Sequence, residues 1–341
     1  MPEVYVNSFC QISVQNPLSD NWTIEPKCFE GKKLVELCDP DYKKYFSSSV
    51  LRRNGNLLRR AMLVSQTAVE MSGLQGVDAV ITGTGLGAVE NTEAFLKQLI
   101  YSGEEFLKPS YFMQSTHNTA SSAVAIHLKC NGYNSTYCQK SLSFESAMLD
   151  AFLQISGSEI KSAFVGGFDE VTPDYFTILE KQGYLGGAMS GFAASSAAGG
   201  VLSCVKNSEA HCKVASVNMV YCSNNKDLID AFEKTLTESG IKKNELTAIV
   251  SGMDGMPAND EVYLQNLCQL GVSCPILKVS HIFGECYTAS AYAFYAAVEC
   301  FKAEKIFSVL TAGNELVNPQ NILLYRHCNN KNHSFILLKK C

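Results

Sequence analysis

Several features that mark particular classes of protein are missing from this sequence. No apolar run is long enough to span a bilayer, and no cluster of basic residues offsets the net charge of -5, so we expect neither a membrane span nor a nucleic-acid partner. The first residues lack the basic and long apolar regions of a signal peptide, so we expect a cytoplasmic protein. The 14 cysteines follow no repeated spacing and form no zinc-binding pattern, which predicts reduced thiols and no metal site.

What the sequence does contain is an alternation of short buried strands with helices. Its 341 residues, 46% of them hydrophobic, suffice for one large domain or two fused halves. Apolar runs predict strands at 4–14, 77–82, 200–205, 214–221, 246–251 and 306–311, with a loop at 183–200. Helical spacing predicts helices at 56–71, 92–101, 116–129, 142–156, 227–239, 261–270 and 288–299. This alternation is typical of mostly parallel sheets covered by helices.

The two halves of the chain echo each other. The segment 164–170 (FVGGFDE) parallels 310–315 (LTAGNE), and 200–206 (GVLSCVK) parallels 334–339 (SFILLK). A repeated pattern of this length indicates a duplicated α/β fold. We therefore predict an N-terminal half at 1–205 and a C-terminal half at 206–341, which together form one compact unit.

Ser141 lies where the helix predicted at 142–156 begins. A side chain there faces the positive end of the helix dipole, which favours developing negative charge, so Ser141 is a candidate nucleophile. Serine at a helix start is more commonly a cap. The glycines at 83–87 fit a dinucleotide-binding fingerprint only loosely, and a tight turn between strand and helix is the commoner reason for them, so we expect no cofactor.

Four segments together resemble the β-ketoacyl synthases. They are 109–116 (PSYFMQST), 164–167 (FVGG), 257–260 (PAND) and 278–291 (KVSHIFGECYTASA), in the order and spacing of that family. The resemblance implies the duplicated thiolase fold, an α-β-α-β-α layering with two mostly parallel mixed sheets. The motif at 143–150 (SFESAMLD) also resembles the chain-length-factor branch, whose members in bacterial polyketide and aryl-polyene systems pair with an active ketosynthase.

The resemblance places the family's catalytic residues on unexpected side chains. The nucleophilic cysteine falls on Ser141, and the two histidines fall on Gly252 and Glu285. Decarboxylative condensation uses a thiolate to accept the acyl group and two imidazoles to stabilise the enolate. A serine hydroxyl is almost fully protonated at neutral pH, and a carboxylate opposes an enolate, so the usual condensation is not expected here.

Three hypotheses follow from this. The principal one is a catalytically silent, chain-length-factor-like partner of an active β-ketoacyl synthase in fatty-acid or polyketide biosynthesis. The alternative is an acyltransferase or 3-oxoacyl synthase-like enzyme that uses Ser141 as acyl nucleophile, with His281 or Glu285 as base. The third is a homodimeric binding protein without acyl chemistry. The resemblance implies a dimer, with itself or with an active ketosynthase, through the helix at 116–129, and an acyl carrier protein as a further candidate partner.

The remaining candidates have competing roles. His117, Cys138, Phe144 and Phe283 are candidate substrate-binding residues. For His117 a hydrogen bond in the core or the interface is the commoner role, and for Cys138 a buried and inert thiol is the favoured interpretation. Glu145 needs a polar pocket or a partner such as Lys140 or Lys161, because burying it unpaired is costly. Asp169, Glu170 and Glu315 are expected to be structural, because acidic residues follow both predicted central strands.

Overall fold

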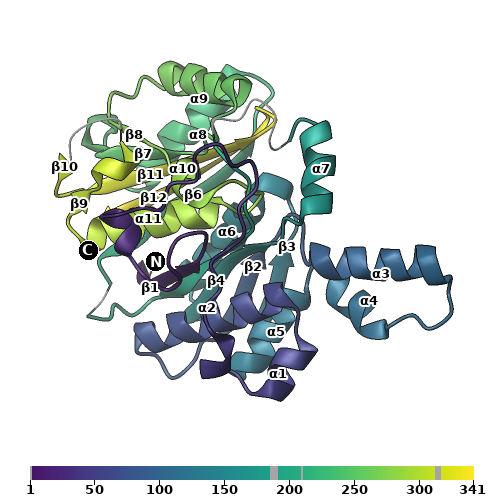
Figure 1. Ribbon diagram of the computed structural model, residues 1–341. Coiled ribbons are helices and arrows are strands. Elements are labelled where there is room, and N and C mark those ends of the chain that lie inside the picture. The colour runs from purple at the N-terminus through teal and green to yellow at the C-terminus, as the bar shows by residue number, and fades with distance from the viewer. Residues whose placement is uncertain (1, 185–190, 209, 312–315) are drawn as a thin grey trace.

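A ten-stranded mixed sheet runs through the computed structural model of the protein, which describes residues 2–184, 191–208, 210–311 and 316–341 (Figure 1). The strand order is β3-β2-β4-β5-β1-β6-β12-β11-β7-β8, and β9 pairs separately with β10. The strands are β1 (Val4–Ile12), β2 (Ala79–Gly83), β3 (Tyr133–Tyr137), β4 (Ser162–Asp169), β5 (Ser196–Ser203), β6 (Cys212–Tyr221), β7 (Ala248–Ser251), β8 (Ile276–Leu277), β9 (Lys305–Ile306), β10 (Leu316–Val317), β11 (Asn321–Cys328) and β12 (Asn332–Lys340).

The sheet consists of two halves with the same topology. One half has the order β3-β2-β4-β5-β1, and the other, followed from its outer edge, has the order β8-β7-β11-β12-β6. In each half the first two pairings are parallel and the next two antiparallel. The halves join through β1 and β6, from the pair Val4–Val214 to the pair Val6–Cys212. This repeated order confirms the duplicated α/β fold.

Helices form three layers around the two halves of the sheet. The helices α2 and α5 pack on the first half, α8 lies against β6 and β12 of the second, and α6 and α11 contact strands of both halves. This arrangement confirms the predicted α-β-α-β-α layering. The expectation of two mostly parallel sheets is corrected, because the two halves join into one mixed sheet in which four of the nine strand pairings are parallel. The helices are α1 (Ser48–Arg53), α2 (Asn56–Ser72), α3 (Val89–Ser102), α4 (Pro109–Ser115), α5 (Thr119–Leu128), α6 (Ser143–Ser156), α7 (Pro173–Lys181), α8 (Asn225–Glu238), α9 (Pro257–Gln269), α10 (Ser280–Phe283) and α11 (Ser290–Lys302).

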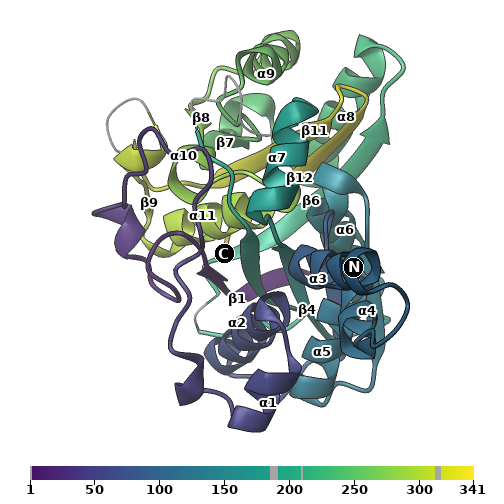
Figure 2. The ribbon, with the colours of Figure 1, turned by 45° about the vertical axis from the view of Figure 1, so that its right-hand side comes forward.

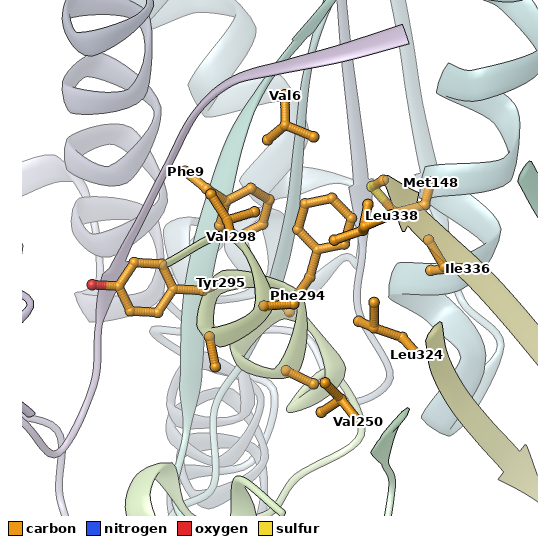
Figure 3. Packing of buried hydrophobic residues seen from close by; sticks show 14 of the residues in the cluster. Val6, Phe9, Met148, Val250, Phe294, Tyr295, Val298, Leu324, Ile336 and Leu338 are labelled. Atoms are coloured by element: carbon orange, nitrogen blue, oxygen red, sulfur yellow. The ribbon is translucent and has the colours of Figure 1, made fainter. Parts of the chain in front are cut away.

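The central core lies around α6 and α11, whose apolar faces are closed off from solvent by both halves of the sheet. Met148 of α6 and Phe294 of α11 pack there with Phe9 of β1 and Leu338 of β12 (Figure 3). Phe294 also contacts Phe9 ring to ring, with the centroids 4.9 Å apart. Because α6 is fixed by this packing, the turn at its start has a defined position.

The structure corrects the prediction of a strand at 306–311. Only Lys305–Ile306 is extended there, and Ser308–Leu310 forms a single 3-10 turn. Ile306, Phe307 and Leu310 are buried, and a short buried apolar run looks the same in a sequence whether it is a strand or a turn. The strand order makes β11 the counterpart of β4, so the proposed echo between 164–170 and 310–315 is wrong; residues 312–315, Glu315 included, lie outside the described residues.

Other boundaries differ by smaller amounts. The strand β5 begins at Ser196, inside the predicted loop at 183–200, and the strands β3 and β11 were not predicted. The second echo, between 200–206 and 334–339, holds, because β5 and β12 occupy equivalent places in the two halves. The division near residue 205 falls between β5 and β6 and stays a prediction.

Three properties of the described chain bear on function. None of its helices has both the length and the apolar character needed to cross a membrane. In the same residues, no three His, Cys, Asp or Glu side chains come together as a metal site would require. All 14 cysteines are free.

Candidate functional site

Ser141 lies in a 3-10 turn, Lys140–Leu142, directly before α6. The turn begins with Lys140 in the left-handed region, at φ 51°. The hydroxyl of Ser143 accepts the backbone N–H of Gln139 at 2.8 Å and donates to the carbonyl of Lys140 at 2.7 Å, so Ser143 closes the turn. Within the described chain Ser141 Oγ has no hydrogen bond, so Ser141 does not cap α6.

Ser141, Gly252 and Glu285 line one pocket of about 550 Å³. Gly252 follows β7, and Glu285 follows α10. The end of β11 and the turn after it add residues 326–330 to the lining. The structure therefore brings together the three positions that the sequence comparison singled out.

Glu285 forms an ion pair with Arg326 of β11 in the wall of this pocket. The two side chains are 8% and 11% exposed, and Nη2 of Arg326 also donates to the carbonyl of Cys286 at 3.3 Å. The backbone of Glu285 is fixed by its N–H, which donates to Phe192, and by its carbonyl, which accepts from Ala194. Glu285 is therefore held in place by both its backbone and its side chain.

Burial raises the pKa of Glu285 to about 7. The attraction of Arg326 lowers this pKa, while the carboxyl groups of Asp254 and Glu145 raise it. Glu145, on α6, is also buried, and burial raises its pKa to about 7 as well. Neither Lys140 nor Lys161 pairs with it in the described chain; the cation that acts on it is Arg326. The guanidinium of Arg326 thus lowers the pKa of three buried carboxyl groups, those of Glu285, Glu145 and Asp254.

The space beside Gly252 is already occupied. A Cβ atom built on Gly252 would lie 2.2 Å from the hydroxyl oxygen of Tyr263 and 3.2 Å from Cγ of Arg326. The Tyr263 side chain is buried, and its hydroxyl accepts the backbone N–H of His327 at 3.1 Å. Any side chain at position 252 would therefore displace these two residues.

Comparison with known proteins assigns the family. A model of the β-ketoacyl synthase N-terminal domain matches residues 44–243, which is more than half of the chain. This protein belongs to the β-ketoacyl synthase family. No curated protein sequence matches it.

Solved structures of ketosynthases share the fold over the whole chain. The ishigamide ketosynthase/chain length factor superposes with a TM-score of 0.83 at 16% identity, over 100% of this chain and 99% of that one. The complex of a ketosynthase with its chain length factor from Xenorhabdus doucetiae gives 0.78 at 13%, over 100% and 98%. A type II PKS acyl-carrier protein in complex with its ketosynthase gives 0.79 at 13%, over 100% of both chains. At these identities the likeness shows the fold, and the protein is a divergent ketosynthase-like member of the family.

A histidine that was not among the predicted site residues also lines the pocket. His327 of β11 stacks on Tyr263 with the ring centroids 4.1 Å apart. Burial lowers the pKa of His327 to about 3, so its imidazole is neutral at physiological pH. The signal for it was a histidine at the end of an apolar run, but that run was not predicted as a strand.

The other predicted site residues lie elsewhere. His281 is exposed on α10, where its Nε2 atom is 2.8 Å from the carbonyl oxygen of Val309. His117 is exposed, while Phe144 and Phe283 are completely buried in the core. Cys138 is exposed as well, so the expectation of a buried thiol there is wrong. None of these five residues is in the lining of the pocket. Of the predicted set, the structure brings together only Ser141, Glu285 and the Gly252 position.

Asp169 holds the glycine-containing turn in place. One of its oxygens accepts the Thr84 hydroxyl at 2.7 Å and the backbone N–H groups of Gly85 and Leu86 at 2.9 and 2.7 Å. Its other oxygen accepts the Thr288 hydroxyl at 2.8 Å. This fully buried carboxylate fixes the turn at 83–87.

Glu170 accepts hydrogen bonds from the starts of two helices. Its carboxylate accepts the backbone N–H of Leu57 in α2 at 3.0 Å and that of Glu90 in α3 at 3.1 Å. Unpaired N–H groups at helix starts need such acceptors. Asp169 and Glu170 therefore have structural roles.

Proposed function

We propose that this protein is a non-condensing subunit of the chain-length-factor type, which pairs with an active β-ketoacyl synthase in fatty-acid or polyketide biosynthesis. The observation that carries the proposal is the composition of the pocket. Where the resemblance puts two histidines, there is a glycine whose side-chain space is filled by Tyr263 and Arg326, and a glutamate paired with Arg326.

This composition is unsuited to decarboxylative condensation. The enolate formed in that reaction needs hydrogen-bond donors that are aimed at its oxygen and free to act. Nη2 of Arg326 already donates to Glu285 and to the carbonyl of Cys286, so it is not free to donate to an enolate. The carboxylate of Glu285 would repel the negative charge of the enolate. Position 141, where the resemblance puts the family's cysteine, carries a serine and no thiol. The thiol of Cys286 lines the same pocket, but it is buried and desolvation raises its pKa strongly.

A partner surface is available on α4, α5 and β3. Ile126 of α5 is 79% exposed, and Met113 and Phe112 of α4 are 68% and 58% exposed. The strand β3 forms an edge of the sheet, where its unpaired backbone groups can join a strand of another chain. Exposed apolar side chains beside a free strand edge support the proposal that a second ketosynthase-fold subunit docks here.

Co-expression with an active β-ketoacyl synthase tests the pairing. We expect a stable 1:1 complex that Ile126→Glu abolishes, because a carboxylate would be buried in the interface. Leu264→Glu on α9, where Leu264 is 52% exposed, is the matched control and should leave the complex intact. Figure 2 shows α5 and α9 at opposite ends of the molecule. A homodimer that never takes up a ketosynthase would instead favour the binding-protein hypothesis.

One observation favours the alternative of an acyl-transfer enzyme. Ser141 Oγ has no hydrogen bond to any residue that the structure describes, and Ser141 lines the pocket at the start of α6, where the helix dipole favours an oxyanion. In the proposed step this oxygen would bond to a thioester carbonyl carbon, the C–S bond would break, and the departing thiol would take the hydroxyl proton. An acyl carrier protein would be the donor. The adduct on Ser141 that this step requires is directly measurable.

A further inference from the structure

A second, very small cavity adjoins the pocket and shares Gly252 and Arg326 with it. Its volume is about 10 Å³, which is close to the minimum that holds one water molecule. Glu145 of α6, Ser290 of α11 and Arg326 of β11 contribute polar groups to its wall. Ser251 and Ser334 also line it, but their hydroxyls already donate to backbone carbonyls, and apolar side chains such as Val250 and Ile336 complete it. The cavity therefore lies where three separate elements meet.

Three polar atoms in this wall have no hydrogen-bond partner within the described chain. They are Oε2 of Glu145, Oγ of Ser290 and Nε of Arg326, and each is buried. The Ser290 hydroxyl lies close enough to the Glu145 carboxyl to lower its pKa, but without the geometry of a hydrogen bond. Glu145 and Ser290 are only 2% and 4% exposed. A buried polar atom without a partner is rare, because it gives up its hydrogen bonds to solvent without replacing them. That three such atoms line one cavity indicates a shared partner.

The chemistry of the three atoms defines that partner. Nε–H of Arg326 is a donor and needs an acceptor, which excludes a cation such as ammonium. Oε2 of Glu145 is an acceptor when ionised and needs a donor, which excludes a simple anion such as chloride. The Ser290 hydroxyl serves in either role. A cavity of this size admits one heavy atom, and the molecule of that size that both accepts and donates is water.

We propose that this cavity is a site for one buried water molecule, which accepts from Nε of Arg326, donates to Oε2 of Glu145 and bonds to Oγ of Ser290. The water would link α6, whose first turn follows Ser141, to the guanidinium that holds Glu285. It would thereby hold Arg326 through Nε, on the same edge of the guanidinium as the Nη2 atom that forms the ion pair. The inference concerns the interior of the fold and is independent of the proposed function.

A crystal structure of the full chain at a resolution that shows ordered water is the direct test. We expect a density peak within about 2.7–3.2 Å of all three atoms. We expect Ser290→Ala to keep the peak with its two remaining partners. An empty cavity in both proteins, or a direct contact between Glu145 and Arg326 that closes it, would overturn the proposal.

A pair of variants gives a test in solution, because the order of their melting temperatures differs between a cavity that holds water and an empty one. Glutamine and methionine have similar size and helix propensity, and both remove the charge of Glu145. With water present, Glu145→Gln retains a hydrogen-bonding partner and should melt at a higher temperature than Glu145→Met. In a dry cavity the apolar methionine would be the more stable of the two, and that order would contradict the proposal.

Discussion

Adding one methyl group at Gly252 tests whether the space beside this glycine, where the resemblance puts a histidine, is closed. In Gly252→Ala the new Cβ would lie 2.2 Å from Oη and 2.9 Å from Cζ of Tyr263. Tyr263 is buried at the wall of the pocket and stacks on His327, so its movement requires repacking, which costs about 1–3 kcal/mol. Its shift would also break the hydrogen bond from the His327 backbone, which costs a further 1–3 kcal/mol or so. We expect a total loss of about 3 kcal/mol in the free energy of unfolding.

Denaturant unfolding measures this loss, with Gly76→Ala as the matched control. Gly76 is exposed, has no atom within 4 Å of a built Cβ and does not need a positive φ, so its substitution should be neutral or slightly stabilising. In a Tyr263→Phe background the nearest clashing atom is gone, and Gly252→Ala should cost about 1 kcal/mol less than in wild type. A Gly252→Ala variant as stable as the Gly76→Ala control would refute the reasoning.

Three further predictions concern the buried carboxyl groups. Burial raises the pKa of Glu145 from 4.5 to about 7, so its protonated form stabilises the fold below pH 4.5, and this contribution is lost as the pH rises through 7. Between pH 4.5 and about pH 8 the wild type should therefore lose about 3 kcal/mol relative to Glu145→Gln in chemical denaturation, and parallel curves would contradict this. Glu170→Ala should lower the free energy of unfolding by about 2 kcal/mol, and Glu170→Gln by less, because glutamine keeps an acceptor for the N–H groups at the helix starts. Equal losses for the two variants would count against the capping role. Arg326→Met should lower the free energy of unfolding by about 3–5 kcal/mol, because it leaves buried carboxyl groups unpaired. Adding Glu285→Met should restore part of this stability. No recovery would show that the ion pair with Glu285 is not the main contact of Arg326.

The elements that the sequence predicts well are those with a strong period. The helices at 56–71 and 142–156 match α2 and α6 within a residue, because their apolar faces are continuous. The strand β3 was missed because it lies at the sheet edge and its residues are exposed or half-buried, without an apolar run. The strand β11 was missed because Arg326 and His327 interrupt its apolar pattern. Their environment is supplied by segments far away in the chain.

In the candidate site, too, some features have a sequence signal and others do not. The resemblance located Ser141, Gly252 and Glu285, which converge on one pocket, because the framework that spaces them is retained. The pairing of Glu285 with Arg326 spans 41 residues, and the filling of the Gly252 space depends on how Tyr263 packs. Neither contact has a local sequence signal. Sequence spacing therefore located the positions, and only the packing shows which side chains surround them.

The central claim is that this pocket does not form an acyl-enzyme. The direct measurement is intact-protein mass spectrometry after incubation with acyl-carrier thioesters of several chain lengths, with the Ser141→Ala variant treated in parallel. A silent subunit predicts unchanged masses for both proteins. A gain of one acyl group on the wild type that Ser141→Ala abolishes would contradict the claim and establish Ser141 as the nucleophile.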